Sequence, residues 1–254
     1  MSVADPDVQE LSNYIYQNVY ANYTAKMWGI SIDKIDKTII DRVQITLSEN
    51  QSYFPNDKYQ GLPVKGYTDT INKILQHPNI KLITNCAQTT VLKVTNHQTF
   101  INDQLTTDTI FYSGSIDELM NYQFGHLTFR SLNFIFKNFP TSRRQTTAVI
   151  NYPTDKQKTR SCEYKIMTQQ NVDGVTTIGE EFPGAYDADS RIFGKPYYPI
   201  NNPENVALYD TYAKELAHCP NVHMIGRMGL YKYLDMDDAI AAVFQLYQAL
   251  HQPI

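Results

Sequence analysis

Apolar residues recur at helical spacing near the beginning of the chain. From Val8 onward they stand three or four positions apart, which predicts an amphipathic helix that continues to Trp28 and ends at Gly29. A second short helix is expected to start near Ser31 or Asp33, with Ile39 and Ile40 on its apolar side. A third is expected over 68–77, just before a proline that cannot continue it. The first part of the chain is therefore predicted to be largely helical.

The segment over 43–62 is predicted to form a loop or edge strands. Between residues 80 and 177 apolar residues recur at every second position. Alternating apolar and polar residues predict short strands. No helical stretch lies between these strands to act as a crossover, so they are expected to pair antiparallel. The segments expected to form strands are 80–84, 91–94, 127–136, 146–152, 161–167 and 175–180.

Helical spacing returns after residue 200. Asn202 and Pro203 match the N-cap and the first position of a helix, which Pro220 is expected to stop. A short apolar strand is expected over 222–225, and Asp237 opens a final helix that has one apolar face.

The composition narrows the class of protein. With 22 basic against 26 acidic residues, the chain has no cationic excess for binding a nucleic-acid backbone. Its three widely spaced cysteines argue against a disulfide framework and favour a reducing, cytoplasmic compartment. No signal-peptide core and no membrane-length apolar run occurs in the sequence. The 19 tyrosines suit either ordinary packing or a site for a polar ligand that carries rings.

Several catalytic motifs are absent from the sequence. The 11 glycines form neither Gly-x-Gly-x-x-Gly nor Gly-x-x-x-x-Gly-Lys, so the chain lacks the usual phosphate-binding turn for a dinucleotide cofactor. There is no Gly-x-Ser-x-Gly nucleophile elbow and no His-Glu-x-x-His pair. The sequence therefore predicts no metal site.

Arginines and aromatic residues stand where a ligand that carries phosphate could be held. Arg42, Arg160 and Arg227 each lie near the end of a predicted element, where a guanidinium suits a bidentate grip on phosphate. Taken alone, each arginine is better explained by a surface ion pair. The tyrosines of 197–199 and 231–233 are likewise explained one by one by packing.

A set of motifs follows one order along nearly the whole chain. The run GRMGLYKYLDMD occupies 226–237, and NYTAKMW occupies 22–28. The other segments are NDKYQGLP at 56–63 with GYT at 66–68, YSGSIDE at 112–118, 124–132, 159–165 and PYYP at 196–199. Together these motifs resemble those of the UDP-galactopyranose mutase family, including its Tyr-Thr-x-Lys-x-Trp helix and its C-terminal Tyr-x-Tyr-x-Asp-Met signature.

The resemblance implies a flavoenzyme. Members of the family interconvert UDP-galactopyranose and UDP-galactofuranose without net redox change, a step associated with cell-wall polysaccharide biosynthesis. In the implied mechanism, reduced FAD attacks the anomeric carbon through flavin N5, which forms a sugar adduct and releases UDP. Ring opening and reclosure then give the other ring size. The cofactor carries the chemistry, and the protein binds the pyrophosphate and orients the sugar.

The resemblance also implies roles for individual residues. Arg42 and Arg160 would grip the diphosphate and serve as the catalytic cations that stabilise UDP as it leaves. Arg227, Asp235 and Met236 would lie beside the flavin, although Asp235 could equally be a helix N-cap. Substrate contacts are implied for Tyr23, Trp28, Tyr53, Asn151, Tyr198 and Tyr233.

One part of the family pattern is missing from this sequence: the strand, Gly-rich turn and helix that bind the ADP half of FAD. Three explanations are open, namely a truncated or split gene, a fragment of a longer protein, and a degenerate mutase that binds a nucleotide sugar without turnover. The intact motifs favour truncation, and we expect the isolated chain to be at most weakly active. A separate N-terminal FAD-domain polypeptide and a homodimer are the partners considered. A non-catalytic UDP-sugar-binding module, or a sheet-based interaction domain without a ligand, is the alternative function.

The expected fold class is α+β. Residues 1–50 would form part of a helical domain, and 51–200 an antiparallel-sheet substrate domain with short helices. Residues 201–254 would form the C-terminal piece of an incomplete Rossmann-like FAD domain. That piece is expected to expose apolar surface.

Overall fold

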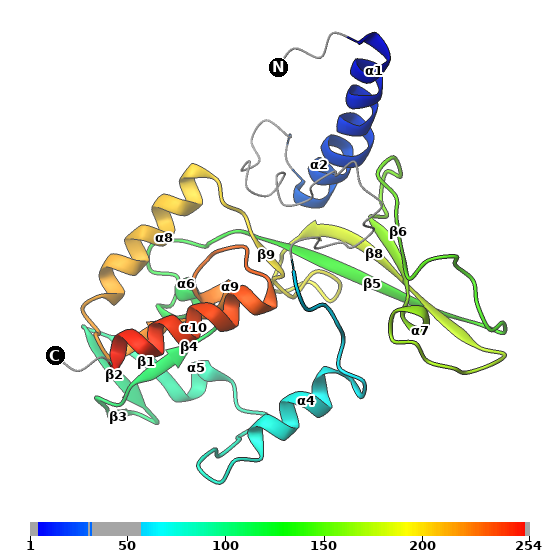
Figure 1. Ribbon diagram of the computed structural model, residues 1–254. Coiled ribbons are helices and arrows are strands. Elements are labelled where there is room, and N and C mark those ends of the chain that lie inside the picture. The colour runs from blue at the N-terminus through cyan, green and yellow to red at the C-terminus, as the bar shows by residue number, and fades with distance from the viewer. Residues whose placement is uncertain (1–4, 30, 32–56, 252–254) are drawn as a thin grey trace. The chain divides into compact units, whose positions relative to one another are not determined.

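The computed structural model describes residues 5–29, 31 and 57–251 (Figure 1). They fall into two compact units, each built from segments that are distant in the sequence. The described residues of the first unit lie within Met1–Lys26, Asp36–Asn85 and Phe134–Phe182, and those of the second within Met27–Ile35, Cys86–Asn133 and Pro183–Ile254. The mixture of helices with antiparallel sheets confirms the α+β class.

The amino-terminal segment is continuously helical, as predicted. It consists of α1 (Pro6–Ile15), the π-helical stretch η1 (Tyr16–Ala21) and α2 (Asn22–Trp28). Gly29 ends α2 with a φ of +67°, a left-handed conformation that glycine adopts without steric cost. The predicted helix over 68–77 is also confirmed, as α4 (Gly66–Leu75). Apart from Ser31, the helix predicted to start near residues 31–33 lies outside the described residues, as does most of the 43–62 segment.

A five-stranded sheet has the order β6-β7-β8-β5-β9. The β6–β7, β7–β8 and β5–β9 pairs are antiparallel. This confirms the pairing that was expected from the lack of crossover helices. The strands are β5 (Phe129–Phe139), β6 (Val149–Asn151), β7 (Arg160–Glu163), β8 (Thr176–Ala185) and β9 (Tyr198–Pro199).

The strand predicted over 80–84 is wrong, and the one predicted over 161–167 is confirmed only over its first three residues. Residues 80–84 form no strand, and the side chains of Leu82 and Ile83 are 58% and 67% exposed. Alternation suits a strand, but a strand also needs a neighbour to complete its hydrogen bonds. After β7, residues 164–167 form a single helical turn, α7 (Tyr164–Met167), followed by the hydrogen bond from Thr168 N–H to the Tyr164 carbonyl at 2.8 Å. A local apolar pattern does not distinguish that turn from a longer strand.

The second unit contains a three-stranded antiparallel meander and a parallel strand pair. The parallel pair joins β4 to β10, which are far apart in sequence, and it was not predicted. The remaining elements here are α5 (Gln88–Val91), β1 (Leu92–Thr95), β2 (Gln98–Ile101), β3 (Gln104–Leu105), β4 (Ile110–Tyr112), α6 (Ile116–Leu119) and β10 (Val222–Met224).

Three C-terminal helices complete the second unit: α8 (Pro203–Leu216), α9 (Gly226–Gly229) and α10 (Met236–Leu250). The predicted cap of α8 is confirmed, because the Asn202 side chain accepts a hydrogen bond from the Asn205 N–H at 2.8 Å. Tyr212 of α8 is fully buried, and its hydroxyl donates to the Gly125 carbonyl at 2.7 Å. This satisfied tyrosine lies in the apolar core, which also contains Ile116 and Leu216.

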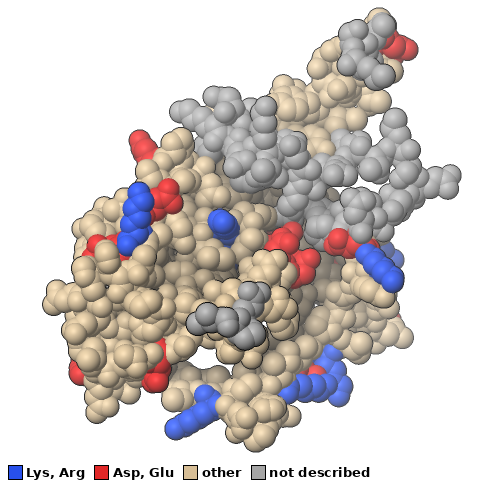
Figure 2. All heavy atoms as spheres, turned by 60° about the vertical axis from the view of Figure 1, so that its left-hand side comes forward, with Lys and Arg blue, Asp and Glu red and all other residues tan. Residues whose placement is uncertain are grey.

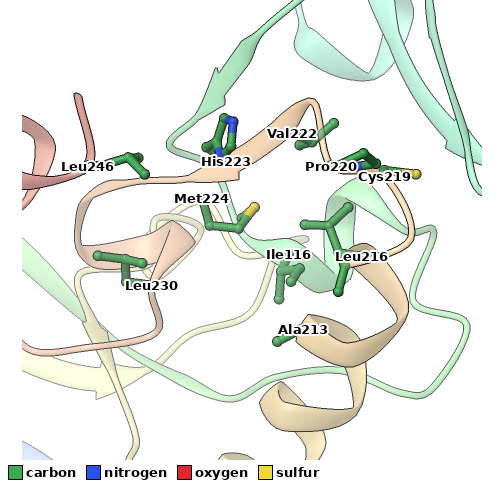
Figure 3. Close-up of a pocket in the computed structure, with 11 residues that line it drawn as sticks. Ile116, Ala213, Leu216, Cys219, Pro220, Val222, His223, Met224, Leu230 and Leu246 are labelled. Atoms are coloured by element: carbon green, nitrogen blue, oxygen red, sulfur yellow. The ribbon is translucent and has the colours of Figure 1, made fainter. Parts of the chain in front are cut away.

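The apolar face of α10 is exposed to solvent, as expected for the C-terminal piece. Ile240, Phe244 and Tyr247 follow helical spacing and are 56%, 64% and 54% exposed. A pocket of about 420 Å³ is lined by mostly apolar side chains of several elements, including Leu246 of α10 and Leu216 of α8 (Figure 3). Exposed apolar surface of this kind is typical of a docking surface.

The surface shows no strongly charged region in the view of Figure 2, where acidic and basic side chains are scattered. Within the part of the chain that the structure describes, no helix has both the length and the apolar character of a membrane span.

Candidate functional site

Three predicted site residues from distant parts of the chain form an aromatic cluster in the second unit. Trp28 ends α2, Tyr198 begins β9, and Tyr233 precedes α10. The ring centroid of Trp28 lies 5.9 Å from that of Tyr198 and 6.0 Å from that of Tyr233. The two tyrosine rings are stacked at 5.5 Å. Trp28 is only 6% exposed, so its ring is packed within the cluster, whereas the rings of Tyr198 and Tyr233 belong to partly exposed residues that a ligand can contact.

Arg227 fixes this cluster from one side. Its guanidinium carbon lies 4.7 Å from the Tyr233 ring centroid and 5.2 Å from that of Tyr198, which is within the range of cation–π attraction. Its Nε donates to the Leu234 carbonyl at 2.9 Å, and one terminal nitrogen donates to the Tyr197 carbonyl at 3.2 Å. Arg227 therefore ties together the two chain segments that carry the tyrosines.

Arg130 positions Trp28, a role that the sequence did not reveal. Its Nε donates to the Met27 carbonyl at 2.8 Å, at the carboxyl end of α2. The negative end of the helix dipole lies there and stabilises a cation. Burial lowers the pKa of Arg130 below its usual value, but an arginine stays protonated at neutral pH. The only signal in the sequence was the position of Arg130 within a family-like segment.

Replacing Gly29 with alanine is expected to destabilise the second unit by about 1–2 kcal/mol from backbone strain alone. A Cβ at Gly29 would also lie 2.6 Å from an Arg130 terminal nitrogen, so the total cost should be larger. Urea unfolding followed by the fluorescence of Trp28, the single tryptophan of the chain, measures this effect.

Gly226→Ala is the matched control, because Gly226 has a similar φ of +71° and its added Cβ would meet nothing closer than 3.8 Å. A loss in Gly29→Ala that does not exceed the loss in Gly226→Ala would show that the contact with Arg130 contributes nothing.

In the first unit, Asn151 and Arg160 lie opposite each other on neighbouring strands. Asn151 of β6 pairs with Arg160 of β7, which in turn pairs with Glu181 of β8. Cross-strand partners share one face of a sheet, so these three side chains form a polar row. Sequence reasoning had singled out Asn151 and Arg160 but missed Glu181.

Glu181 forms a mostly buried ion pair with Arg160. Its carboxylate oxygen lies 3.0 Å from Arg160 Nε, with the side chains 10% and 32% exposed, respectively. Burial raises the pKa of Glu181, while Arg160 and the Thr159 hydroxyl act in the opposite direction. Glu181 contacts the Nε nitrogen of the guanidinium, and this contact sets the orientation of the planar group and of its two terminal nitrogens.

Lys26 holds the loop that joins β6 to β7. Its ammonium donates to the carbonyls of Tyr152, Asp155 and Lys158. Burial lowers the pKa of Lys26, and the Asp155 carboxylate partly offsets this effect. Three accepting carbonyls match the three donors of an ammonium group, so α2 fixes the hairpin that carries Asn151 and Arg160.

The other predicted residues have simpler surroundings. Tyr23 is half-buried on α2, and Met236 is 61% exposed at the start of α10. Asp235 is the N-cap of α10 and forms a capping box with Asp238, which confirms the N-cap alternative. Arg42 and Tyr53 lie outside the described residues. Of the predicted site residues that the structure describes, none lines the apolar pocket of Figure 3.

Comparisons with known proteins point to one family. The family model described as UDP-galactopyranose mutase matches residues 18–233. The chain is similar to the UDP-galactopyranose mutase of Mycoplasma pneumoniae, with 42% identity over 92% of this chain and 59% of the relative. It is also similar to that of Mycoplasma genitalium, with 40% identity over 98% of this chain and 61% of the relative.

A more distant relative carries a different name. The dTDP-fucopyranose mutase of Escherichia coli is 28% identical over 92% of this chain and 60% of its own length. The chain therefore spans about three fifths of the length of the curated relatives it matches. Because the family model covers most of the sequence and two relatives exceed 30% identity over nearly all of it, this chain belongs to the UDP-galactopyranose mutase family.

Proposed function

We propose that this chain provides the UDP-sugar-binding part of a mutase that interconverts UDP-galactopyranose and UDP-galactofuranose. The observation that carries the proposal is the cluster of Trp28, Tyr198 and Tyr233 beside Arg227. These residues come from three separate family motifs, and their rings pack together although the motifs are far apart in sequence. Aromatic faces with a few placed polar groups suit a ligand that has a base, a sugar and a charged linker.

The proposed roles follow the chemistry of each group. Trp28 and Tyr23 would contact the uridine, while Tyr53, Tyr198 and Tyr233 would line the phosphate and sugar region. Arg160 and Arg42 would bind the diphosphate, and Asn151 would add a neutral hydrogen-bonding group. A guanidinium that faces the diphosphate stabilises the negative charge that develops when the bond to the sugar breaks.

Reduced FAD is the cofactor that we infer. The residues of this chain suit its isoalloxazine ring but not its pyrophosphate. Arg227, Asp235 and the exposed Met236 precede or begin α10 and would lie along the edge of the isoalloxazine ring. The sequence has no Gly-x-Gly-x-x-Gly turn to bind the pyrophosphate. When bound, the reduced flavin would supply the nucleophile for the anomeric carbon. The residues of this chain would bind, orient and shield the sugar.

We infer that a further polypeptide segment, corresponding to the N-terminal FAD domain, docks on the second unit. The apolar face of α10 is exposed, and the adjoining pocket has a mostly apolar lining. Among the residues that the structure describes, the parallel sheet consists of the β4–β10 pair alone, whereas parallel strands usually belong to larger sheets that are covered on both faces.

Ligand titration tests the binding proposal. Purified full chain is titrated with UDP, and with ADP as a matched control, by calorimetry and by Trp28 fluorescence. We expect UDP to bind more tightly than ADP and to change the fluorescence, because the uridine would lie against the aromatic cluster. Equal binding of the two nucleotides, or no binding of either, would contradict the proposal.

Turnover tests the catalytic part. UDP-galactofuranose is supplied with reduced FAD to the chain alone, and to the chain mixed with the N-terminal segment of the Mycoplasma pneumoniae relative. We expect little conversion by the chain alone and clear conversion by the mixture. Specific UDP binding with no conversion in either sample would favour the non-catalytic binding module and overturn the mutase proposal.

A further inference from the structure

Three side chains that can ligate a metal ion meet at the end of α8, and none of them is a residue of the proposed mutase site. Glu215 and His218 belong to the carboxyl end of α8 and the turn after it, and His97 lies in the turn between β1 and β2. One ligand atom from each of the three residues lies within 4.8 Å of the other two. Figure 1 shows this end of α8 beside the β1–β2 hairpin.

The hairpin holds His97 in an unusual conformation. Asn96 and His97 are the two residues between the last cross-strand pair, Thr95 and Gln98, and their φ values are +50° and +59°. Two positive φ values fit a type I′ turn, where Asn-Gly is the common sequence. Histidine is one of the few residues other than glycine that are enriched at such φ values, so the turn accommodates His97 and carries its imidazole in the place of the usual glycine.

The helix end supplies the other two groups from one face. Glu215 and His218 are three residues apart, and the His218 N–H donates to the Glu215 carbonyl at 3.2 Å. Residues at this spacing are neighbours on a helical surface. The His97 and His218 rings lie 4.4 Å apart, and His97 Nε2 lies 3.0 Å from a Glu215 carboxylate oxygen.

Two imidazoles and one carboxylate form a donor set for zinc-class cations. Zn²⁺ binds histidine nitrogen and carboxylate oxygen at about 2.0–2.2 Å, and three protein ligands with a water in the fourth position form a common type of site. Ligand atoms around such an ion are separated by roughly 3.3 Å, which follows from those bond lengths. The His97–Glu215 separation is already close to this value, and the half-exposed His97 side chain can rotate to complete the geometry.

We propose that His97, Glu215 and His218 form a binding site for a zinc-class divalent cation that links the β1–β2 hairpin to α8. A water molecule completes the coordination. The site does not depend on the proposed mutase function, because none of its ligands belongs to the UDP-sugar site. The simpler alternative is a hydrogen-bonded His97–Glu215 pair with a stacked His218.

Metal titration of the full chain separates these alternatives. Chelator-treated protein is titrated with ZnCl₂ by calorimetry, and with Co²⁺ by visible absorption, which reports four-coordinate geometry. The variants are Glu215→Gln, His218→Ala and His97→Asn, the last because asparagine tolerates a positive φ. The controls are His77→Ala and Cys86→Ser, which remove exposed donor groups outside the cluster.

We expect one equivalent of Zn²⁺ to bind to the wild-type chain and to both controls. Loss of a group that only hydrogen-bonds to a metal ligand lowers metal affinity by about 10- to 100-fold, so loss of any one ligand should lower it at least as much. Zn²⁺ should also slow amide exchange at the β1–β2 turn in the wild type and not in His97→Asn. Absence of one-equivalent binding, or binding that His97→Asn leaves unchanged, would overturn the proposal.

Discussion

Replacing Arg160 with alanine is expected to weaken UDP binding by about 10- to 100-fold, while the binding of uridine changes little. A hydrogen bond to a charged group contributes roughly 1.5–3 kcal/mol, and the bidentate geometry of a guanidinium fits a phosphate. Uridine carries no phosphate, so it should not depend on this contact. Calorimetric titration of both ligands into the wild type and the variant measures the difference.

The same substitution leaves the Glu181 carboxylate buried without its cation, so a structural effect must be separated from a binding effect. Arg160→Lys keeps a positive charge next to Glu181 but loses the planar guanidinium that can bind a phosphate through two nitrogens. This variant should bind UDP with intermediate affinity. Arg191→Ala, which removes an exposed arginine, is the matched control and should match the wild type. An equal loss of uridine and UDP affinity in Arg160→Ala would assign Arg160 a purely structural role.

Replacing Glu163 with alanine is expected to destabilise the first unit by roughly 3–5 kcal/mol. This carboxylate is fully buried at the end of β7. It accepts hydrogen bonds from the backbone N–H groups of Gln145 and Arg144 and from the Thr176 hydroxyl at 2.6–3.1 Å. Removing it leaves the buried Thr176 hydroxyl and the two partly buried N–H groups without this acceptor. Urea unfolding followed by circular dichroism measures the loss.

The pH dependence gives a second signature of Glu163. Burial would raise its pKa, but the hydrogen bonds from Thr176, Gln145 and Arg144 together hold the pKa below its usual value. The ionised form therefore favours folding. This stabilisation is present above the unfolded pKa of about 4.3 and is lost as the pH falls through the folded-state pKa. The difference in unfolding free energy between the wild type and Glu163→Gln should shrink as the pH falls below about 4.

Glu10→Ala is a suitable control, because Glu10 is an exposed acid on α1 in the same unit. A loss in Glu163→Ala no larger than in Glu10→Ala would mean that the buried hydrogen bonds contribute little to stability.

Local signals in the sequence were sufficient for most of the helices. The Asn202-Pro203 cap, the Gly29 terminus and the apolar spacing of α10 are encoded by neighbouring residues. Capping and periodicity depend on short-range sterics and hydrogen bonds. Residues 80–84 failed as a strand for the opposite reason. Their alternation is local, but a strand exists only where another strand completes its hydrogen bonds.

In the candidate site, too, some residues could be predicted from local sequence and others could not. Motif resemblance identified Trp28, Tyr198, Tyr233 and Arg160 because each lies in a short recognisable segment. It gave no sign that Arg227 bridges the carbonyls of two such segments. Nor did it reveal Glu181, which stands 21 positions after Arg160 and is its neighbour only across β7 and β8.

The sequence by itself determined the family, the α+β class and the chemical types of the residues in the proposed site. Only the tertiary structure decided which side chains lie together: Trp28 with Tyr233, Arg160 with Glu181, and His97 with Glu215. The physical reason is the separation along the chain over which each interaction acts. Helix caps and apolar periods act over a few residues. Ion pairs, ring contacts and shared ligand sets depend on distances of a few ångströms between groups that the chain brings together only when it folds.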